Sequence, residues 1–352
     1  MKAMGRRIWD ILPLMAWVGL VAVCLYALTP TQWRMLGDGA ATLAVGLQAP
    51  RESIEYWQHA KQYAASPSDG SPAFPTVYTG ELYDASASVI PPKGDGGGAV
   101  SEEQLGGEAV VGAVAIKNSS GVSFDFEALL KAGVSLGEAT DGPQVLIVHT
   151  HATERYMSYY AGYYNDDDPV RSTDNAENVT AVGEAIAQEL RAAGIGVIHD
   201  TTHHDHPAYT GAYDRSAQTV SAYLREYPSI RVVLDIHRDA IMRDDLTKVK
   251  PTTTVAGQKA SQMMIIVGAT STEERPNAYC EDNLRFGLGL HQALEEAHSG
   301  LMRPLYLVDA RYNQGLKAGS LLVEIGTDAN TLSESLVSGR LLGKQLAAML
   351  AR

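Results

Sequence analysis

Cysteine is almost absent from this sequence, whose 352 residues include only Cys24 and Cys280. A disulfide framework needs several paired cysteines, and a zinc site of the cysteine type needs several in one region. The two cysteines here lie in very different parts of the chain. Both kinds of site are therefore excluded, and any bound metal ion must be held by histidine and carboxylate side chains.

Basic stretches are missing as well. Lysine and arginine number 28 against 41 aspartate and glutamate residues, which gives a formal charge of −13. An acidic balance without a basic patch argues against nucleic-acid binding, so no nucleic-acid partner is expected. The sequence has no internal repeat. Its hydrophobic content of 45%, its charged content of 20% and its length are typical of a globular protein with one or two domains.

An apolar segment at residues 11–28 follows Lys2, Arg6 and Arg7. About 18 apolar residues are enough to cross the hydrocarbon core of a bilayer. A cleaved signal peptide is the alternative, but no small-x-small cleavage site follows the segment. We expect an uncleaved single-pass anchor that contacts membrane lipid, with the amino terminus in the cytoplasm because the basic residues precede the span. The rest of the chain is then extracytoplasmic.

Residues 31–108 have the composition of a connecting segment. A juxtamembrane stretch comes first, Ser, Pro, Gly and Asp become frequent after Ala64, and residues 91–98 are of low complexity. Such a composition buries too little apolar surface to order itself. The sequence therefore predicts three parts: a cytoplasmic tip and transmembrane anchor at 1–30, a flexible linker at 31–108, and a folded domain at 109–352.

In the folded domain, short apolar runs alternate with amphipathic helical patterns. In the helix expected at residues 178–193, Val179, Val182 and Ile186 fall on one face, and Gly194 ends it. Alternating strands and helices predict an α/β fold with a mostly parallel sheet and helices on both faces. The expected strands are residues 110–117, 145–149, 195–199, 232–237, 263–267, 305–308 and 321–325, and the expected helices are 126–131, 178–193, 213–227, 281–297 and 332–350.

Polar side chains follow the apolar strand that begins at Val145. His149 ends this strand, and His151 and Glu154 lie on the loop that follows it. Ligands and metal ions bind such sheets just beyond the carboxyl ends of the strands. The sequence does not decide whether His149 or His151 is the ligand. His149 can point into the sheet or support the ligands from behind, whereas His151 lies on the loop and is freer to reach a metal ion.

Two later strands bring further candidates to the same edge. The strand at 232–237 ends in His237, and the last strand carries Glu324 inside an apolar run. A buried carboxylate is costly unless it is paired or binds a metal ion. Zinc takes imidazole and carboxylate ligands, and a second carboxylate can accept a proton from water beside the metal ion. The sequence therefore predicts a Zn²⁺ site held by His151, Glu154 and His237, with Glu324 as the catalytic base.

Other polar groups offer competing explanations. A single histidine at a strand end is often only a hydrogen-bonded structural residue. The cluster at residues 203–206, His-His-Asp-His, is a rival metal site, although contiguous loop histidines are more often solvated, or at the edge of a site, than a rigid set of ligands. The acidic run at 166–168 is interpreted as a solvated loop. Asp235 shares a strand face with His237, so it either orients a neighbour or pairs with Arg238.

Four motifs then point to a family. They resemble the stage II sporulation protein P family, and the resemblance extends from about Val114 to the end of the chain. The motifs are V-L-I-V-H-T-H-A-T-E at 145–154, N-V-T-A-V-G at 178–183, D-I-H-R-D-A at 235–240 and L-V-E-I-G-T-D-A-N at 322–330, with I-K-N-S-S at 116–120 upstream. This family is similar to zinc-dependent N-acetylmuramoyl-L-alanine amidases, which implies an amidase-like fold with its zinc site at the carboxyl ends of the strands.

The resemblance also implies roles for single residues. Glu324 matches the catalytic glutamate, and His237 and His151 match the histidine ligands. The carboxylate ligand stays open between Glu154, whose motif match is better, and Glu177, which begins the first helix as in the wider amidase class. Arg238 and Asp239 match residues that hold substrate or shape the pocket, so these two are the expected substrate-binding residues.

The implied activity is cleavage of the amide between muramic acid and L-alanine in peptidoglycan, with a second endopeptidase activity on cross-linked stems. The implied setting is cell-wall remodelling during sporulation and engulfment, with a membrane anchor and the stage II sporulation proteins D and M as partners. Two alternatives remain: a metal-dependent peptidase or deacetylase acting on another amide, and a peptidoglycan-binding module without catalysis.

Overall fold

The computed structural model describes residues 90–269 and 277–351 of the chain. Within these two ranges, no helix combines the length and the apolar character needed to cross a bilayer. The expected anchor at residues 11–28 and most of the expected linker lie outside the described residues.

The larger sheet of the described domain has the strand order β2-β3-β11-β10-β12-β7-β4-β6. Its strands are β2 (Ala109–Val111), β3 (Val114–Ser119), β4 (Val145–Val148), β6 (Val197–His199), β7 (Val232–Asp239), β10 (Met263–Gly268), β11 (Leu305–Val308) and β12 (Ser320–Thr327). β6, β4, β7 and β12 run parallel to one another, but β10 is antiparallel to β12 and β2 is antiparallel to β3. The expectation of a mostly parallel sheet is therefore wrong, and the sheet is mixed.

The direction of β10 is the main reason why the sheet is mixed. An apolar run such as residues 263–267 predicts a buried strand but not its direction, since period and burial are the same either way. A β-hairpin formed by β8 (Lys248–Val255) and β9 (Gln258–Ser261) intervenes between β7 and β10. The chain therefore enters β10 from the opposite end of the sheet, without the helical crossover that a parallel connection requires.

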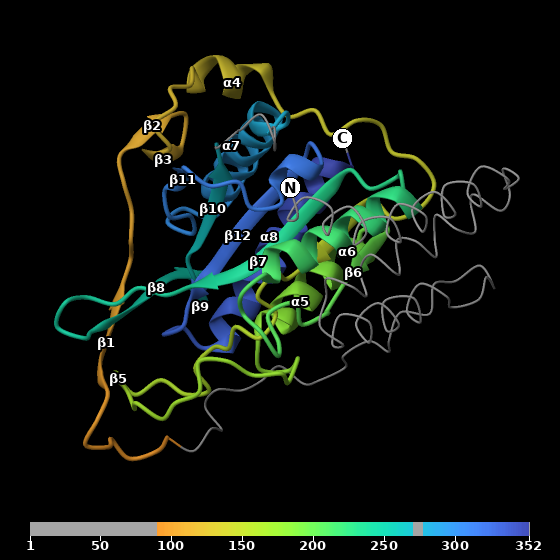
Figure 1. Ribbon diagram of the computed structural model, residues 1–352. Helices are drawn as coiled ribbons and strands as arrows, with labels where there is room; N and C mark the ends of the chain where they lie inside the picture. The colour runs from red at the N-terminus through yellow and green to blue at the C-terminus, as the bar shows by residue number, and fades with distance from the viewer. Residues whose placement is uncertain (1–89, 270–276, 352) are drawn as a thin grey trace, which may run out of the picture. The chain divides into compact units, whose positions relative to one another are not determined.

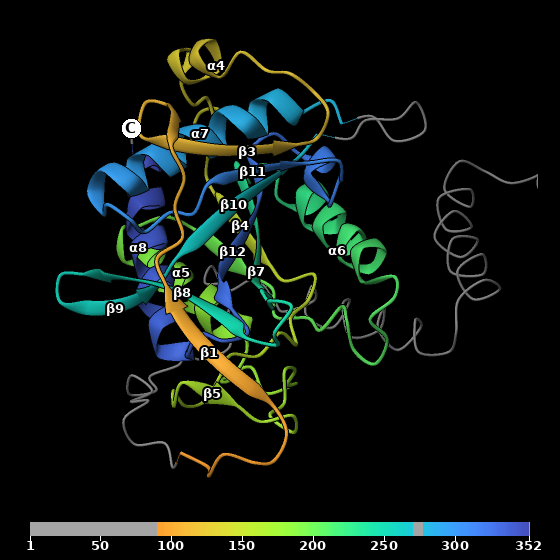
Figure 2. The same cartoon turned by 90° about the vertical axis from the view of Figure 1, so that its left-hand side faces the viewer.

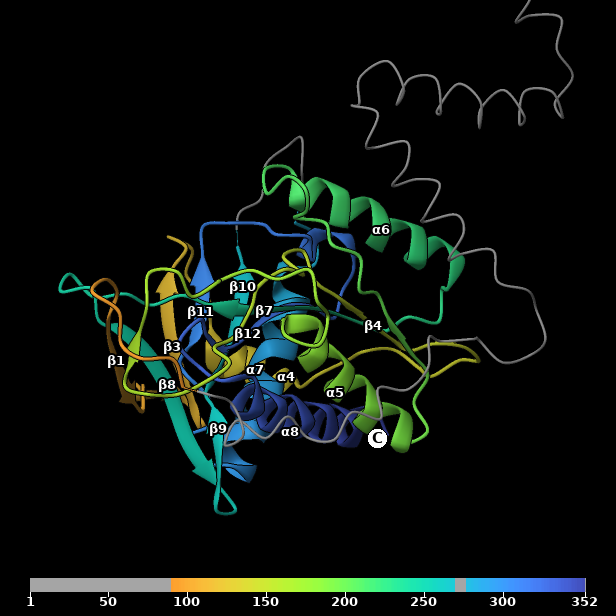
Figure 3. The ribbon, with the colours of Figure 1, turned by 90° about the horizontal axis from the view of Figure 1, so that it is seen from below.

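Helices cover both faces of the larger sheet, as expected. One face packs against α5 (Val179–Ala192), α7 (Cys280–Ala297) and α8 (Leu332–Leu350), and the other against α6 (Ala212–Glu226). Figures 2 and 3 show α6 on one side of the sheet and the three other helices on the opposite side. The short α4 (Phe126–Ala132) contributes partly buried residues to the edge of the larger core.

The core follows from the strand sequences. All four residues of β4 are buried, as are all six of β10. Ile147, Leu234 and Ile236 point to the layer of three helices, and Leu146, Val148 and Val233 point to α6. A strand whose two faces are both covered is apolar along most of its length, so a carboxylate within it, such as Asp235 or Glu324, needs a partner or a ligand.

A second sheet has the order β5-β1-β8-β9 and lies beside the carboxyl ends of β7 and β12 (Figure 1). Its strand β1 (Gly98–Glu103) falls in the stretch that the sequence assigns to the linker, and it pairs with β8 and with β5 (Tyr163–Tyr164). Val100 is buried against Tyr164. The last part of the expected linker is thus an ordered strand of the folded domain.

The glycines of the low-complexity run are needed for this packing. A Cβ atom on Gly97 would lie 2.1 Å from the carbonyl oxygen of Tyr164, and one on Gly98 would lie 2.4 Å from that of Leu246. Gly97 also has a φ of 98°, which side chains rarely allow. Glycines that are typical of a flexible linker are therefore used here to let the backbone of β1 pack closely against the backbone at Tyr164 and Leu246.

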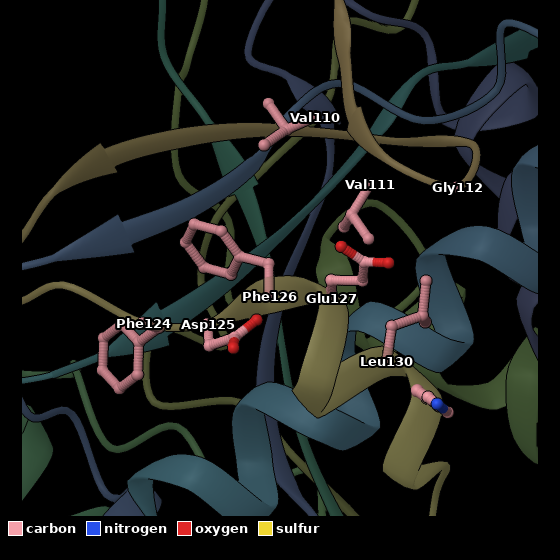
Figure 4. A pocket seen from close by; sticks show the side chains of 9 residues that line it. Val110, Val111, Gly112, Phe124, Asp125, Phe126, Glu127 and Leu130 are labelled. Carbon is pink, nitrogen blue, oxygen red and sulfur yellow. The ribbon is translucent and has the colours of Figure 1, made fainter.

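A cleft of about 620 Å³ lies between the β2–β3 hairpin and α4. Figure 4 shows Phe124 and Phe126 on one side of it and Val110 and Val111 on the hairpin. None of the predicted site residues lines this cleft.

Candidate active site

The carboxyl ends of β4, β7 and β12 meet at one edge of the larger sheet. In the parallel pairing of β7 with β12, Glu324 is directly opposite His237. Side chains that are opposite each other in register lie on the same face of a sheet. His237 and Glu324 therefore share the face that α6 covers, where Tyr213 of α6 stacks against the His237 ring at a centroid distance of 6.4 Å.

The loop after β4 brings His151 and Glu154 to the same place. The rings of His151 and His237 are edge to face, with their centroids 5.4 Å apart. Glu154 Oε2 lies 3.5 Å from His237 Nδ1 and accepts a hydrogen bond of 3.0 Å from the backbone N–H of Arg238. The three side chains that the sequence assigns as ligands are thus brought together.

Carboxylates on both sides hold a proton on the His237 ring. Its Nε2 lies 2.9 Å from Asp235 Oδ1, while Nδ1 faces Glu154. Burial disfavours a charged imidazole, but the negative charge of Asp235 and Glu154 outweighs it and raises the pKa of His237 well above its ordinary value. Asp235 also accepts hydrogen bonds from the N–H and hydroxyl of Thr150, at 2.8 and 2.6 Å. Asp235 therefore orients its neighbours rather than pairing with Arg238.

Glu324 has the opposite electrostatic character. Burial raises its pKa to about 8, and the nearby charge of His237 only partly offsets this effect. Its Oε2 atom is buried and has no hydrogen-bond partner among the described residues. A carboxyl group that holds its proton close to neutral pH is suited to proton transfer.

His149 belongs to a separate buried network. Its Nδ1 lies 2.9 Å from the carbonyl oxygen of Ile236, and its Nε2 lies 2.9 Å from His199 Nε2. His199 Nδ1 in turn lies 3.0 Å from Glu184 Oε2. A Cβ atom on Gly183 would lie 2.5 Å from the His149 ring, so a glycine is needed for the helix to approach it. Since both ring nitrogens of His149 contact other protein groups, His149 packs behind the end of β4 and does not join the cluster of His151, Glu154 and His237.

The remaining predicted side chains are held by protein groups. Glu177 is half-exposed and pairs with Arg155 at 2.9 Å. Arg238 donates to the carbonyl oxygens of Arg155, Asp239 and Val170, so its guanidinium braces the loop after β4. Asp239 pairs with Arg303 at 2.9 Å.

The rival cluster at 203–206 does not gather around one point. His203 contacts Asn175 at 2.7 Å, whereas His204 is buried, with its Nε2 3.0 Å from the hydroxyl of Thr219. Asp205 points toward the predicted site, with its Oδ2 3.9 Å from His151 Nδ1. Its carboxylate also accepts hydrogen bonds from the hydroxyl of Thr153 and from Arg171, both at 2.6 Å.

Tyr209 and Arg303 are neighbours of the site that the sequence interpretation missed, and Asp205 was considered only as part of the rival cluster at 203–206. The Tyr209 ring stacks on His151 at a centroid distance of 4.4 Å. The carboxylate within a histidine-rich run was the signal for Asp205, since a ligand histidine commonly needs a carboxylate partner. Arg303 had no local signal, because only the antiparallel direction of β10 brings it to this edge.

The donor types of the cluster fit zinc, although the side chains are not arranged as a finished metal site. Among the described residues, no three His, Cys, Asp or Glu side chains lie in an arrangement that holds a metal ion. His151 Nδ1 and Glu324 Oε2 are among the buried atoms of the cluster that have no hydrogen-bond partner among the described residues. Buried polar atoms of this kind require a ligand, an ion or water. Two imidazoles and a carboxylate are a common ligand set for catalytic zinc.

Comparison with known proteins identifies the family. The family model of stage II sporulation protein P matches residues 100–347. This chain belongs to the stage II sporulation protein P family. A curated stage II sporulation protein P from Bacillus subtilis (strain 168) is 29% identical over 205 residues, which cover 55% of this chain and 48% of that protein. The match thus spans about half the length of the curated relative.

Solved structures give more distant likenesses. The N-acetylmuramyl-L-alanine amidase Ami1 from Mycobacterium smegmatis has a TM-score of 0.36 at 12% identity, covering 61% of this chain and 99% of that one. An N-acetylmuramoyl-L-alanine amidase from Clostridium difficile 630 has a TM-score of 0.31 at 12% identity, covering 60% and 96%. At these scores neither structure defines the fold or activity of this member of the family.

Proposed function

We propose that this member of the stage II sporulation protein P family is a peptidoglycan hydrolase: a zinc-dependent N-acetylmuramoyl-L-alanine amidase with an additional endopeptidase activity. The observation that carries the proposal is the register of β7 and β12, which puts Glu324 beside His237 while Glu154 and His151 approach from the loop after β4. Family membership supports a role in cell-wall remodelling during sporulation.

His151, Glu154 and His237 would hold the zinc ion. Bound zinc supplies Lewis-acid activation of water and of a carbonyl group. His237 must release its proton for this, so zinc binding weakens as the pH falls. Asp235, 2.9 Å from His237 Nε2, and Asp205, 3.9 Å from His151 Nδ1, would orient the two imidazoles, which is the usual role of a carboxylate behind a ligand histidine.

Glu324 would move the proton during cleavage. As a carboxylate it accepts a proton from the attacking water, and as a carboxylic acid it donates that proton to the leaving amine of L-alanine. Burial raises its pKa to about 8, which favours the donating form. Positive charge on the metal ion favours the accepting form, so both forms are within reach near neutral pH.

The proposal extends to the cellular setting. The protein is anchored in the cell membrane by residues 11–28, with its catalytic domain outside and its amino terminus in the cytoplasm. Its partners are peptidoglycan and the stage II sporulation proteins D and M. The apolar segment after basic residues and the family membership support this placement.

Digestion of purified sacculi by the full-length chain tests the activity. We expect release of stem peptides with free L-alanine amino termini, detected by mass spectrometry, and shortened cross-linked stems where the endopeptidase acts. Glu324→Gln keeps the shape of the side chain but removes its ability to accept and donate a proton. The release of stem peptides should therefore fall about 10²- to 10⁴-fold, with zinc content unchanged. The exposed Glu296→Gln is the matched control and should retain activity.

Other results would point elsewhere. Binding to sacculi without any cleavage indicates a peptidoglycan-binding module. Products with intact muramoyl amides indicate a peptidase or deacetylase of another amide. Full activity of Glu324→Gln removes that residue from its role.

A further inference from the structure

Arg303 reaches the edge of the candidate site from an unexpected direction. It lies just before β11, which runs parallel to β10. Since β10 is antiparallel to β12, the amino ends of β10 and β11 lie at the carboxyl end of β12. The N–H of Arg303 donates to the carbonyl oxygen of Met263 at 2.7 Å, which fixes its backbone beside the start of β10.

The guanidinium of Arg303 is buried and only partly paired. Its side chain is 10% exposed, and one amino group, Nη2, lies 2.9 Å from Asp239 Oδ2. The other amino group, Nη1, is buried and has no hydrogen-bond partner among the described residues. Arg303 is near enough to Glu324 for its charge to lower the pKa of that carboxyl, against the larger effect of burial. A donor that is buried without an acceptor, beside the catalytic candidate, calls for a ligand that supplies one.

The charges around Arg303 indicate what kind of acceptor fits. Asp239 already neutralises the guanidinium, and Glu154 and Glu324 lie on the same side of the sheet edge. A further carboxylate from a ligand would meet three protein carboxyl groups, which disfavours it. A neutral carbonyl oxygen meets no such repulsion. The amide that contains it would also offer a nitrogen to Glu324, whose Oε2 has no hydrogen-bond partner in the part of the chain that the structure describes.

We propose that Arg303 contacts the substrate, with Nη1 donating a hydrogen bond to the carbonyl oxygen of the amide that is cleaved. The inference rests on the proposed amidase function and adds a residue to it. Negative charge develops on this oxygen during attack, so the contact strengthens as the reaction proceeds. Asp239 holds the guanidinium in place and acts as a positioning residue.

Kinetics of Arg303 variants of the full-length chain on a soluble muramoyl peptide test the contact. We expect R303Q to lower kcat about 10²- to 10³-fold, as loss of a preorganised donor does, with KM changed little. R303K should lower kcat at least tenfold, because one ammonium group cannot pair with Asp239 and also donate at the Nη1 position. Zinc content, measured by atomic absorption, should equal that of the unmodified chain. The partly exposed Arg285, which pairs with Asp282 on α7, provides the control R285Q.

The outcomes separate the two proposals. A folded R303Q, or a folded R303K if R303Q does not fold, that retains the kcat of the unmodified chain overturns the role of Arg303 alone. A rise in KM with unchanged kcat also overturns it, since the contact would then not strengthen during the reaction. Failure of the unmodified chain to cleave any muramoyl peptide overturns the proposed function, and the Arg303 contact with it.

Discussion

Asp205 shows how one carboxylate connects a loop to the candidate ligands. It accepts hydrogen bonds from Thr153 and Arg171 and lies 3.9 Å from His151 Nδ1. The side chain is fully buried, so these contacts determine its direction. Asp205 is therefore held in a position from which it can orient His151, the candidate ligand that lies on a loop rather than on a strand.

We predict that Asp205→Asn weakens zinc binding about 10- to 100-fold, the usual effect of removing a carboxylate behind a ligand histidine. Competition with a fluorescent chelator at fixed pH measures the affinity. Asp244→Asn, an exposed position, should bind zinc like the unmodified chain. Equal affinities in the two folded variants would show that Asp205 does not orient the ligand.

Residue patterns made part of this site predictable. His151, Glu154, His237 and Glu324 each follow or interrupt an apolar strand, and such interruptions are rare unless a site requires them. The sequence did not decide between His149 and His151, because both lie near the strand end and the loop position of His151 gives only a preference. Only the contacts of His149 with Ile236 and His199 separate them.

At the scale of elements, β1 lies within the expected linker and pairs with segments close to the site. It pairs with β5, which lies in the tyrosine-rich loop after Glu154, and with β8, which follows Asp239. Ion pairs join Glu102 to Lys259 at 2.7 Å and Glu103 to Arg243 at 2.6 Å. The loop after β4, which carries His151 and Glu154, and the hairpin that follows Asp239 are therefore braced by the same strand.

We predict that Gly98→Ala loosens this brace. The new Cβ would lie 2.4 Å from the carbonyl oxygen of Leu246, an overpacking that costs about 1–3 kcal/mol. Thermal unfolding should occur at a lower temperature, and limited proteolysis within residues 156–165 should be faster. Gly106→Ala is a suitable control because no atom lies within 4 Å of its added Cβ. Equal behaviour of both variants would contradict the role of β1.

The element pattern was predictable where periodicity carries the information. The expected helix at 332–350 and strand at 305–308 agree with α8 and β11 to the residue. The expected strand at 110–117 is two strands instead, because Gly112 turns the chain with a φ of 53°. Periodicity also gave no warning of β1, since glycine-rich sequence is typical of linkers until another backbone packs against it.

For the whole molecule, buried neutral histidines make stability depend on pH. His291 is 1% exposed, and its Nε2 lies 3.1 Å from the carbonyl oxygen of Arg303. Burial lowers its pKa below the ordinary value of 6.5. As the pH falls below about 6.5, His291 is therefore protonated in the unfolded chain before it is protonated in the folded chain. This contribution to stability is complete above about pH 6.5 and is lost as the pH falls through the lowered pKa.

We predict that the free energy of unfolding decreases from pH 7 to pH 5 less steeply in His291→Gln than in the unmodified chain. Each unit by which burial lowers the pKa corresponds to about 1.4 kcal/mol. The raised pKa of Glu324 has the opposite effect, because the free energy of unfolding falls as the pH rises toward 8. Both chains contain Glu324, so its contribution cancels when the two pH profiles are compared. Urea unfolding of metal-free protein at several pH values measures this. Parallel profiles would exclude a role for His291.

The account depends on a single metal ion bound between β4 and β7, which a crystal structure of zinc-soaked protein with anomalous data at the zinc edge tests most directly. We predict one strong peak about 2.0–2.2 Å from ligand atoms of His151, Glu154 and His237, with Glu324 beside it but not bound. A peak at residues 203–206, or no peak in well-ordered protein, would contradict the account.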